Sequence, residues 1–325
     1  MKRNYKLDRM RIWAAILVVL IHVTAFLPRE NRENINNYYW YRPILNMGVP
    51  YFFGVSGYLL QKKSDDYFRK YSKNIGAMFL IYSIFYVVVD IVIVWITRGD
   101  LFFAMREWIK QFQWVSLING TWGQFHLWYL FALMVGAYVL GWFIQHQLSP
   151  RRIFLGALII NLIYWLMPES TWLNEFFIYG GVLKALLYIS LGYCLAESKP
   201  IYIFKGWQII LLAILFSLVY NYLDYGILSD VMLLVITYGW LSNVFYDPGQ
   251  YNLLNDMSEY SLDIYVMHIF FLKIIQTYGE GTVWTWLHHD GLYTLLVSCI
   301  CIFGSMVVYP VFKKVIFEPL HRLLL

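Results

Sequence analysis

Charged residues are scarce in this chain. Only 14% of its 325 residues are Asp, Glu, Lys or Arg, whereas 60% are hydrophobic and 20% aromatic. Soluble domains carry about 25% charged residues, so this chain has too little charge to cover a globule of its size with a water-facing surface. Its apolar content is too high for intrinsic disorder. The composition therefore indicates a polytopic membrane protein.

Cysteine is also scarce, which excludes a disulfide scaffold. The three cysteines lie in apolar runs and are predicted to act as small hydrophobes: Cys194, Cys299 and Cys301. The net charge of +5 is expected to reflect cytoplasmic anchoring, so no nucleic-acid partner is predicted. His288 and His289 precede Asp290 in a predicted outer loop, but spacing fixes no further ligand, and no metal is predicted.

Long apolar runs dominate the sequence. A run of about 20 residues crosses roughly 30 Å of hydrocarbon. The sequence predicts ten such spans: Ile12–Leu27, Ile44–Leu60, Ile75–Ile96, Leu127–Ile144, Ile153–Met167, Gly180–Ala196, Trp207–Leu223, Ile227–Phe245, Ser261–Thr277 and Leu292–Ile316. The predicted fold class is therefore an all-α integral membrane bundle of about ten transmembrane helices.

The distribution of basic residues predicts the orientation of the bundle. With a cytoplasmic N-terminus, 17 of the 25 Lys and Arg residues fall in inner segments and six in outer segments. Basic residues accumulate on the cytoplasmic side, so both termini are predicted to be cytoplasmic. We expect one transmembrane domain over 1–325 with no soluble accessory domain. The outer segment 97–126 holds three tryptophans and is typical of an interfacial or re-entrant segment.

Ionisable residues inside a span are costly and suggest function. His22 lies about 15 Å beyond Ile12, and Arg11 precedes it by eleven positions. Eleven steps of 100° return to within about 20° of the same helix face, roughly 16 Å along the axis. A long ligand could therefore lie along this face, with an anionic head at Arg11 and a reactive end at His22. The alternative is a structural histidine and a simple cytoplasmic anchor.

Three further segments carry candidate residues. Ser261, Tyr265 and His268 share one face of the ninth predicted span, either as a site or as a polar seam between helices. The segment Gly48-Val-Pro-Tyr-Phe-Phe-Gly-Val-Ser56-Gly-Tyr favours close helix packing over a catalytic Ser56, since it lacks a Gly-x-Ser-x-Gly elbow. A predicted inner loop holds basic residues that either anchor the topology or bind phosphates: Arg69, Lys70 and Lys73.

Together these residues resemble the membrane acyltransferase-3 family. The segments that carry the resemblance are Arg11-x10-His22, Gly48–Leu60, Lys70-x-x-Lys73 at the usual Arg-x-x-Arg position, His126-Leu-Trp128-Tyr-Leu, Ser261-x-x-x-Tyr265-x-x-His268 and Phe317-Glu318-Pro319. Lysine in place of arginine at Lys70 and Lys73 is a departure, because lysine cannot grip a phosphate bidentately.

The resemblance implies an O-acyltransferase that moves an acyl group across the membrane. The expected donor is cytoplasmic acyl-CoA, with acetyl-CoA favoured, and the expected acceptor is a hydroxyl of a cell-surface or lipid-linked glycan. His22 would act as general base or carry a transient acyl group. Other roles implied are oxyanion stabilisation at Ser56, Tyr265 or His268, phosphate binding at Arg11, Arg69, Lys70 and Lys73, and substrate binding at His126 and Trp128.

The expected location is the plasma membrane, as a multi-pass protein in contact with the lipid bilayer. A homo-oligomer and an assembly with polysaccharide-synthesis machinery both stay open as partners. The main alternative function is a transporter or exporter of a polysaccharide or small polar solute, which broken midplane helices would support. A purely structural membrane subunit is disfavoured by the shared face of Arg11 and His22.

Overall fold

The computed structural model describes residues 3–25, 41–167, 171–178, 181–198, 201–222, 227–279 and 290–324. This part of the chain is almost entirely helical and contains no β-strand, which confirms the predicted all-α class for the described residues. Residue contacts divide the chain into two compact units. One consists of Met1–Gln61 with Leu191–Pro310, and the other of Lys62–Ser190 with Val311–Leu325.

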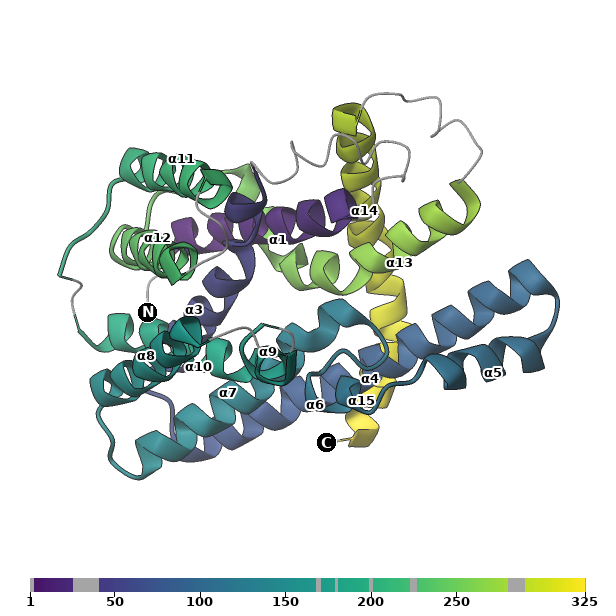
Figure 1. Ribbon diagram of the computed structural model, residues 1–325, viewed down its shortest axis with the longest axis horizontal. Coiled ribbons are helices and arrows are strands. Elements are labelled where there is room, and N and C mark those ends of the chain that lie inside the picture. Colours follow the sequence, from purple (N-terminus) through teal and green to yellow (C-terminus); the bar gives the residue numbers. More distant parts are fainter. Residues whose placement is uncertain are drawn as a thin grey trace. The chain divides into compact units, whose positions relative to one another are not determined.

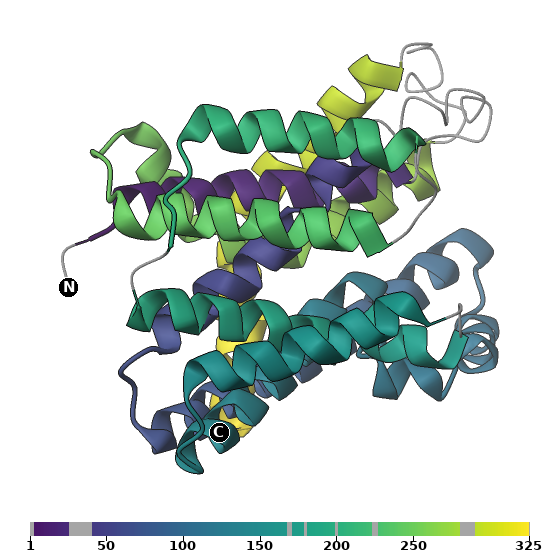
Figure 2. The same cartoon turned by 60° about the vertical axis from the view of Figure 1, so that its left-hand side comes forward.

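The first unit is built around α1. Its elements are α1 (Tyr5–Ala25), α3 (Gly48–Leu60), the end of α10 (Val182–Glu197), α11 (Gly206–Tyr222), α12 (Ile227–Tyr246), the 3₁₀ segment η3 (Leu253–Tyr260), α13 (Ser261–Gly279) and most of α14 (Asp290–Phe312). Helix α1 packs against α3, α12, α13 and η3. Figure 1 shows α13 running beside α1, and Figure 2 shows α12, which packs against both α1 and α11.

Hydrogen bonds attach the N-terminal end of α1 to the segment before α13. The Asn255 side-chain amide donates to the Tyr5 carbonyl at 2.6 Å, and the Lys6 amide donates to the Pro248 carbonyl at 2.9 Å. Asn255 belongs to η3, which leads directly into α13. These bonds therefore fix the position of α1 along the axis of α13. The two helices carry the candidate histidines.

Glycines allow α3 to approach its neighbours closely. A Cβ atom on Gly48 would lie 2.8 Å from the Ala14 carbonyl oxygen of α1, and one on Gly192 would overlap the backbone of Gly54. Contacts this short are not possible for a residue with a side chain in an unshifted backbone. The structure thus confirms that this segment serves close helix packing.

The second predicted span, Ile44–Leu60, is wrong as a single helix. Residues 41–45 are helical, 46–47 form a turn, and α3 begins at Gly48. Pro50 explains the break, because a proline ring clashes with the carbonyl four residues earlier, here that of Asn46. At 1.5 Å per residue, α3 is only about 20 Å long, less than the roughly 30 Å of a hydrocarbon core.

The second unit is built around α4. Its elements are α4 (Asp65–Arg98), α5 (Leu101–Gln111), α6 (Val115–Ile118), η2 (Phe125–Leu127), α7 (Trp128–Gln145), α8 (Pro150–Leu166), α9 (Thr171–Phe177), the first part of α10, the π-helical turn η5 (Lys313–Phe317) and α15 (Glu318–Leu324). Helix α4 packs against α7 and α5, and α5 folds back along it as a hairpin (Figure 1).

The outer segment predicted to be interfacial contains α5. The Phe102 and Ile109 side chains project outward from this helix, 85% and 64% exposed, whereas Ala104 is buried. The helix is thus amphipathic, with apolar residues on its outward side. Its position at the membrane interface stays a prediction.

Five helical segments in the described residues are long and apolar enough to cross a membrane: Asp65–Arg98, Phe125–Gln145, Trp172–Glu197, Leu228–Tyr246 and Gly291–Leu324. They coincide with the third, fourth, sixth, eighth and tenth predicted spans. The other five predicted spans overlap α1, α3, α8, α11 and α13, which fall short in length or apolarity. The chain is a membrane protein with several apolar helices, and the number ten and the cytoplasmic termini stay predictions.

Candidate functional site

The centre of the candidate site is a pair of histidines from α1 and α13. The Nδ1 atom of His22 lies 2.8 Å from the Nε2 atom of His268. Their ring planes are nearly parallel, with centroids 5.0 Å apart and an angle of 18° between the planes. Two imidazoles from opposite ends of the sequence therefore share one hydrogen bond.

A second contact joins the same two helices. Arg11 donates a hydrogen bond from Nη2 to the hydroxyl oxygen of Ser261 at 3.1 Å. Arg11 and His22 therefore both contact α13, and Ser261 and His268 both contact α1. This confirms the shared faces predicted from helical periodicity on both helices.

The two histidines differ in their access to solvent. His268 is fully buried, and its Nδ1 atom lies 2.9 Å from the carbonyl oxygen of Ile264 one turn earlier. His22 is partly exposed at the surface of the unit, and the Val18 carbonyl accepts a hydrogen bond from its ring. His22 is thus the more exposed of the two histidines. Sequence reasoning missed the two carbonyls, although both stand at the i−4 position from a histidine.

The residues predicted to stabilise the oxyanion differ in the contacts that they make. The Tyr265 ring lies beside His268, with centroids 6.4 Å apart. The Ser56 hydroxyl donates to the Phe52 carbonyl of its own helix at 2.9 Å. Both ring nitrogens of His268 are engaged by His22 and Ile264. We therefore retain Tyr265 as the predicted hydrogen-bond donor to the oxyanion, and His268 is expected to have a different role.

Arg11 supplies positive charge at the other end of the same face. It is partly buried, and among the described residues it forms no ion pair. A guanidinium has five N–H donors, and the Ser261 hydroxyl engages one nitrogen. Arg11 therefore has donors and charge suited to an anionic ligand.

The second unit carries the other predicted phosphate-binding residues. Arg69, Lys70 and Lys73 lie in the first turns of α4 and not in a loop, so their predicted loop position is wrong. Asp65 and Asp66 occupy the first turn of α4. Their negative charges interact favourably with the positive end of the helix dipole, which helps the helix to begin at this position. The three basic side chains are exposed and form no ion pairs within the described part of the chain.

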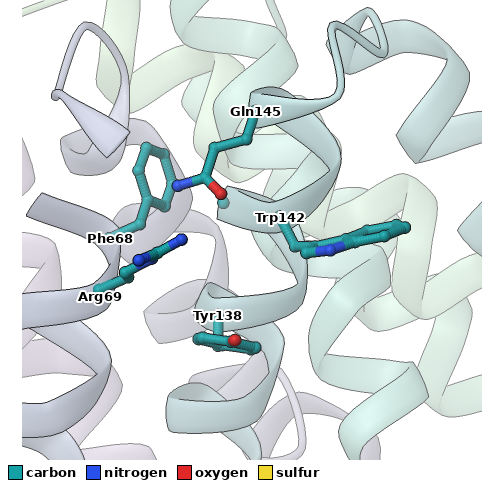
Figure 3. A pocket seen from close by; sticks show the side chains of 6 residues that line it. Phe68, Arg69, Tyr138, Trp142 and Gln145 are labelled. Carbon is teal, nitrogen blue, oxygen red and sulfur yellow. The ribbon is translucent and has the colours of Figure 1, made fainter. Parts of the chain in front are cut away.

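Arg69 also lines a shallow pocket on the second unit. The pocket is open to solvent, and its lining is Phe68, Arg69, Tyr138, Gly141, Trp142 and Gln145. Figure 3 shows the Arg69 guanidinium and the Gln145 amide facing the same hollow, with Tyr138 and Trp142 on the α7 side. Sequence reasoning missed the α7 residues. Their spacing of i, i+4 and i+7, which places Tyr138, Trp142 and Gln145 on one face, was the available signal.

His126 and Trp128 stand at the beginning of α7 in the second unit. His126 is only 1% exposed, and its ring packs edge-on against Tyr86, with centroids 5.1 Å apart. Trp128 is partly exposed. Their substrate-binding role stays a prediction. Among the described residues, no three potential metal ligands gather, and His288 and His289 lie outside those residues.

Comparison with known proteins identifies the family. The acyltransferase-3 model, described as an acyltransferase domain, matches residues 4–310. The chain belongs to this family. It is therefore a membrane acyltransferase, and the matched region includes both histidines and all the predicted basic residues of α1 and α4.

The acyltransferase is also similar to an amino-acid racemase of Enterococcus faecalis. The two sequences are 25% identical over 217 residues, which is 62% of this chain but only 29% of the racemase. The chain thus spans less than a third of the length of this relative. No solved structure is significantly similar to the acyltransferase.

Proposed function

We propose that the chain transfers an acyl group, with acetyl favoured, from cytoplasmic acyl-CoA to a hydroxyl of a cell-surface or lipid-linked glycan at the outer face of the plasma membrane. The observation that carries the proposal is the arrangement along α1. A partly exposed imidazole and an arginine without an ion-pair partner among the described residues stand about 16 Å apart on one face.

The chemistry assigns His22 the role of general base. Its imidazole takes the proton of the acceptor hydroxyl as the hydroxyl oxygen attacks the thioester carbonyl carbon. The C–S bond then breaks, and the departing thiolate takes the proton back from the imidazolium. The products are an ester and free CoA, and His22 returns to its neutral form. Tyr265 beside the pair is the proposed donor to the tetrahedral oxyanion.

Basic side chains provide sites for the phosphates of the donor. Arg11 offers a planar fork of donors, which suits bidentate contact with a phosphate. On the second unit, Lys70 and Lys73 act as point charges, while Arg69 stands beside the Tyr138 and Trp142 rings. Because these cations are not neutralised by acidic partners within the described residues, each retains charge for an anionic ligand.

The proposal is tested with membrane vesicles from cells with and without this chain. Radiolabelled acetyl-CoA is supplied to the cytoplasmic face, and alkali-labile label is measured in the glycan fraction. We expect ester label that depends on the chain, and only when the donor is on the cytoplasmic side. Absence of chain-dependent ester, together with chain-dependent movement of glycan or solute, would contradict acyl transfer and favour the transporter alternative.

A further inference from the structure

We propose that His268 is a positioning residue that fixes His22 in one tautomer and stabilises the positive charge that His22 acquires when it takes up a proton. The inference rests on the proposed function of His22 as a base, but its structural part can be tested without any acyl transfer. It starts from two contacts of the buried His268 ring. One is with the Ile264 carbonyl at 2.9 Å, and the other is with the His22 ring at 2.8 Å.

The Ile264 carbonyl determines where the His268 proton sits. A carbonyl oxygen only accepts hydrogen bonds, so the Nδ1 atom of His268 must carry hydrogen. His268 is fully buried, and burial disfavours the charged form of an imidazole, so the ring is neutral. A neutral ring with hydrogen on Nδ1 has a lone pair on Nε2. The Nε2 atom of His268 is thus an acceptor.

This acceptor in turn determines the tautomer of His22. The Nδ1 atom of His22 faces the Nε2 lone pair of His268, so it must be the donor. With hydrogen on Nδ1, the lone pair of His22 lies on Nε2, which is the atom that can accept a proton from a substrate.

The arrangement corresponds to that of a catalytic triad with an imidazole in the place of the carboxylate. In such a triad the third residue holds the base in the correct tautomer and stabilises the imidazolium that forms. When the Nε2 atom of His22 takes a proton, its Nδ1–H bond to His268 becomes charge-assisted and stronger. His268 then stabilises the positive charge of His22 without contacting the substrate.

The experiment uses the full chain in lipid bilayers with ¹⁵N-labelled histidine rings. Solid-state NMR reports which nitrogen of each ring carries hydrogen, and the His22→Ala variant identifies the His22 signals. We expect hydrogen on Nδ1 and a lone pair on Nε2 of His22 near neutral pH. Hydrogen on Nε2 of His22 in the wild type would overturn the inference. This result does not depend on finding an acceptor, so it separates failure of the inference from failure of the proposed function.

Two variants of similar size test the acceptor at position 268. His268→Gln keeps an oxygen near the Nε2 position, whereas His268→Met fills the space without a strong acceptor. Where the wild type shows acyl transfer, we expect the Met variant to lose about 10²-fold in kcat with little change in KM, and the Gln variant to stay within about fivefold of the wild type. Equal rates for the wild type and the Met variant would contradict a positioning role, as would equal losses in the two variants. Thermal unfolding of both variants checks that the fold is retained.

Discussion

Arg11 and Ser261 lie 3.1 Å apart, and the contact has a counterpart further along the same two helices between His22 and His268. Eleven residues separate the two contacts on α1 and seven on α13, which correspond to about 16 Å and about 10 Å. The Arg11 side chain is long enough to span the difference of roughly 6 Å. Because both contacts follow the same chain order, α1 and α13 run parallel, and their register brings the two histidines together.

The basic face of α4 predicts an effect on donor affinity. Replacing Lys70 and Lys73 together with Gln should weaken acetyl-CoA binding about tenfold at low salt, because exposed charged contacts contribute up to about 1 kcal/mol each. The effect should shrink as salt screens the charges. Calorimetric titration of the purified chain measures the affinity.

A matched control separates a specific phosphate site from general charge. Arg151 and Arg152 are exposed at the beginning of α8, and replacing both with Gln removes the same charge from the same unit. We expect this variant to bind acetyl-CoA like the wild type. If the two double variants bind acetyl-CoA with equal affinity, Lys70 and Lys73 act only as topology anchors and do not form a specific phosphate site.

The ion pair between Lys6 and Asp247 predicts a pH-dependent contribution to stability. The Lys6 ammonium donates to the Asp247 carboxylate at 2.6 Å and lowers the pKa of that carboxyl below its usual value. A carboxyl with a lowered folded-state pKa stabilises the fold above its unfolded pKa of about 3.9, and this contribution is lost as the pH falls through the folded pKa. Asp247→Asn should therefore lower the Tm at pH 7 and leave the Tm unchanged at a pH below the folded-state pKa of Asp247.

The expected size of this effect is small, because the Asp247 side chain is 59% exposed and exposed pairs contribute at most about 1 kcal/mol. Thermal unfolding in detergent between pH 7 and pH 3 measures it. Glu259→Gln removes an exposed carboxylate that forms no ion pair among the described residues and serves as the control. A Tm difference for Asp247→Asn that stays constant across the whole pH range would refute the assignment.

Close packing around α3 predicts that Gly192 tolerates no side chain. Gly192→Ala would force a methyl group into the Gly54 backbone, and overpacking of this kind costs about 1–3 kcal/mol. We expect a lower Tm and a lower yield of folded protein in membranes. Gly156→Ala, inside α8 where nothing lies within 4 Å of the added carbon, should lower neither, because alanine favours a helix more than glycine does. Comparable losses for the two variants would show that helix packing at Gly192 is not the cause.

Periodicity predicted much of the site because it depends on one helix at a time. The shared face of Arg11 and His22 follows from eleven steps of 100°, and that of Ser261 and His268 from seven. Each predicted span overlaps a helix for a similar reason, since apolar runs favour helices in a membrane. The close approach of α3 was predictable from its glycines.

Other features depend on contacts between distant segments or on single residues. The pairing of α1 with α13 depends on the Asn255 bond to Tyr5 and on neighbours far away in sequence, and no pattern within one helix encodes it. The second predicted span runs across the turn at residues 46–47, because a span defined by hydrophobicity does not show where Pro50 breaks the helix. The third predicted span begins at Ile75, ten residues after the start of α4 at Asp65, because an apolar run marks the membrane-crossing part of a helix and not its charged first turns.

The central claim is that His22 is the base that activates the acceptor. The most direct measurement is the rate of acetyl ester formation on glycan by wild type and His22→Ala at equal membrane abundance. His321→Ala, a histidine substitution in α15 outside the site, is the control. Because a positioned general base contributes about 10²–10⁴-fold, we expect the His22→Ala rate to fall by that factor while His321→Ala keeps the wild-type rate. Acylation by His22→Ala at the wild-type rate would contradict the account.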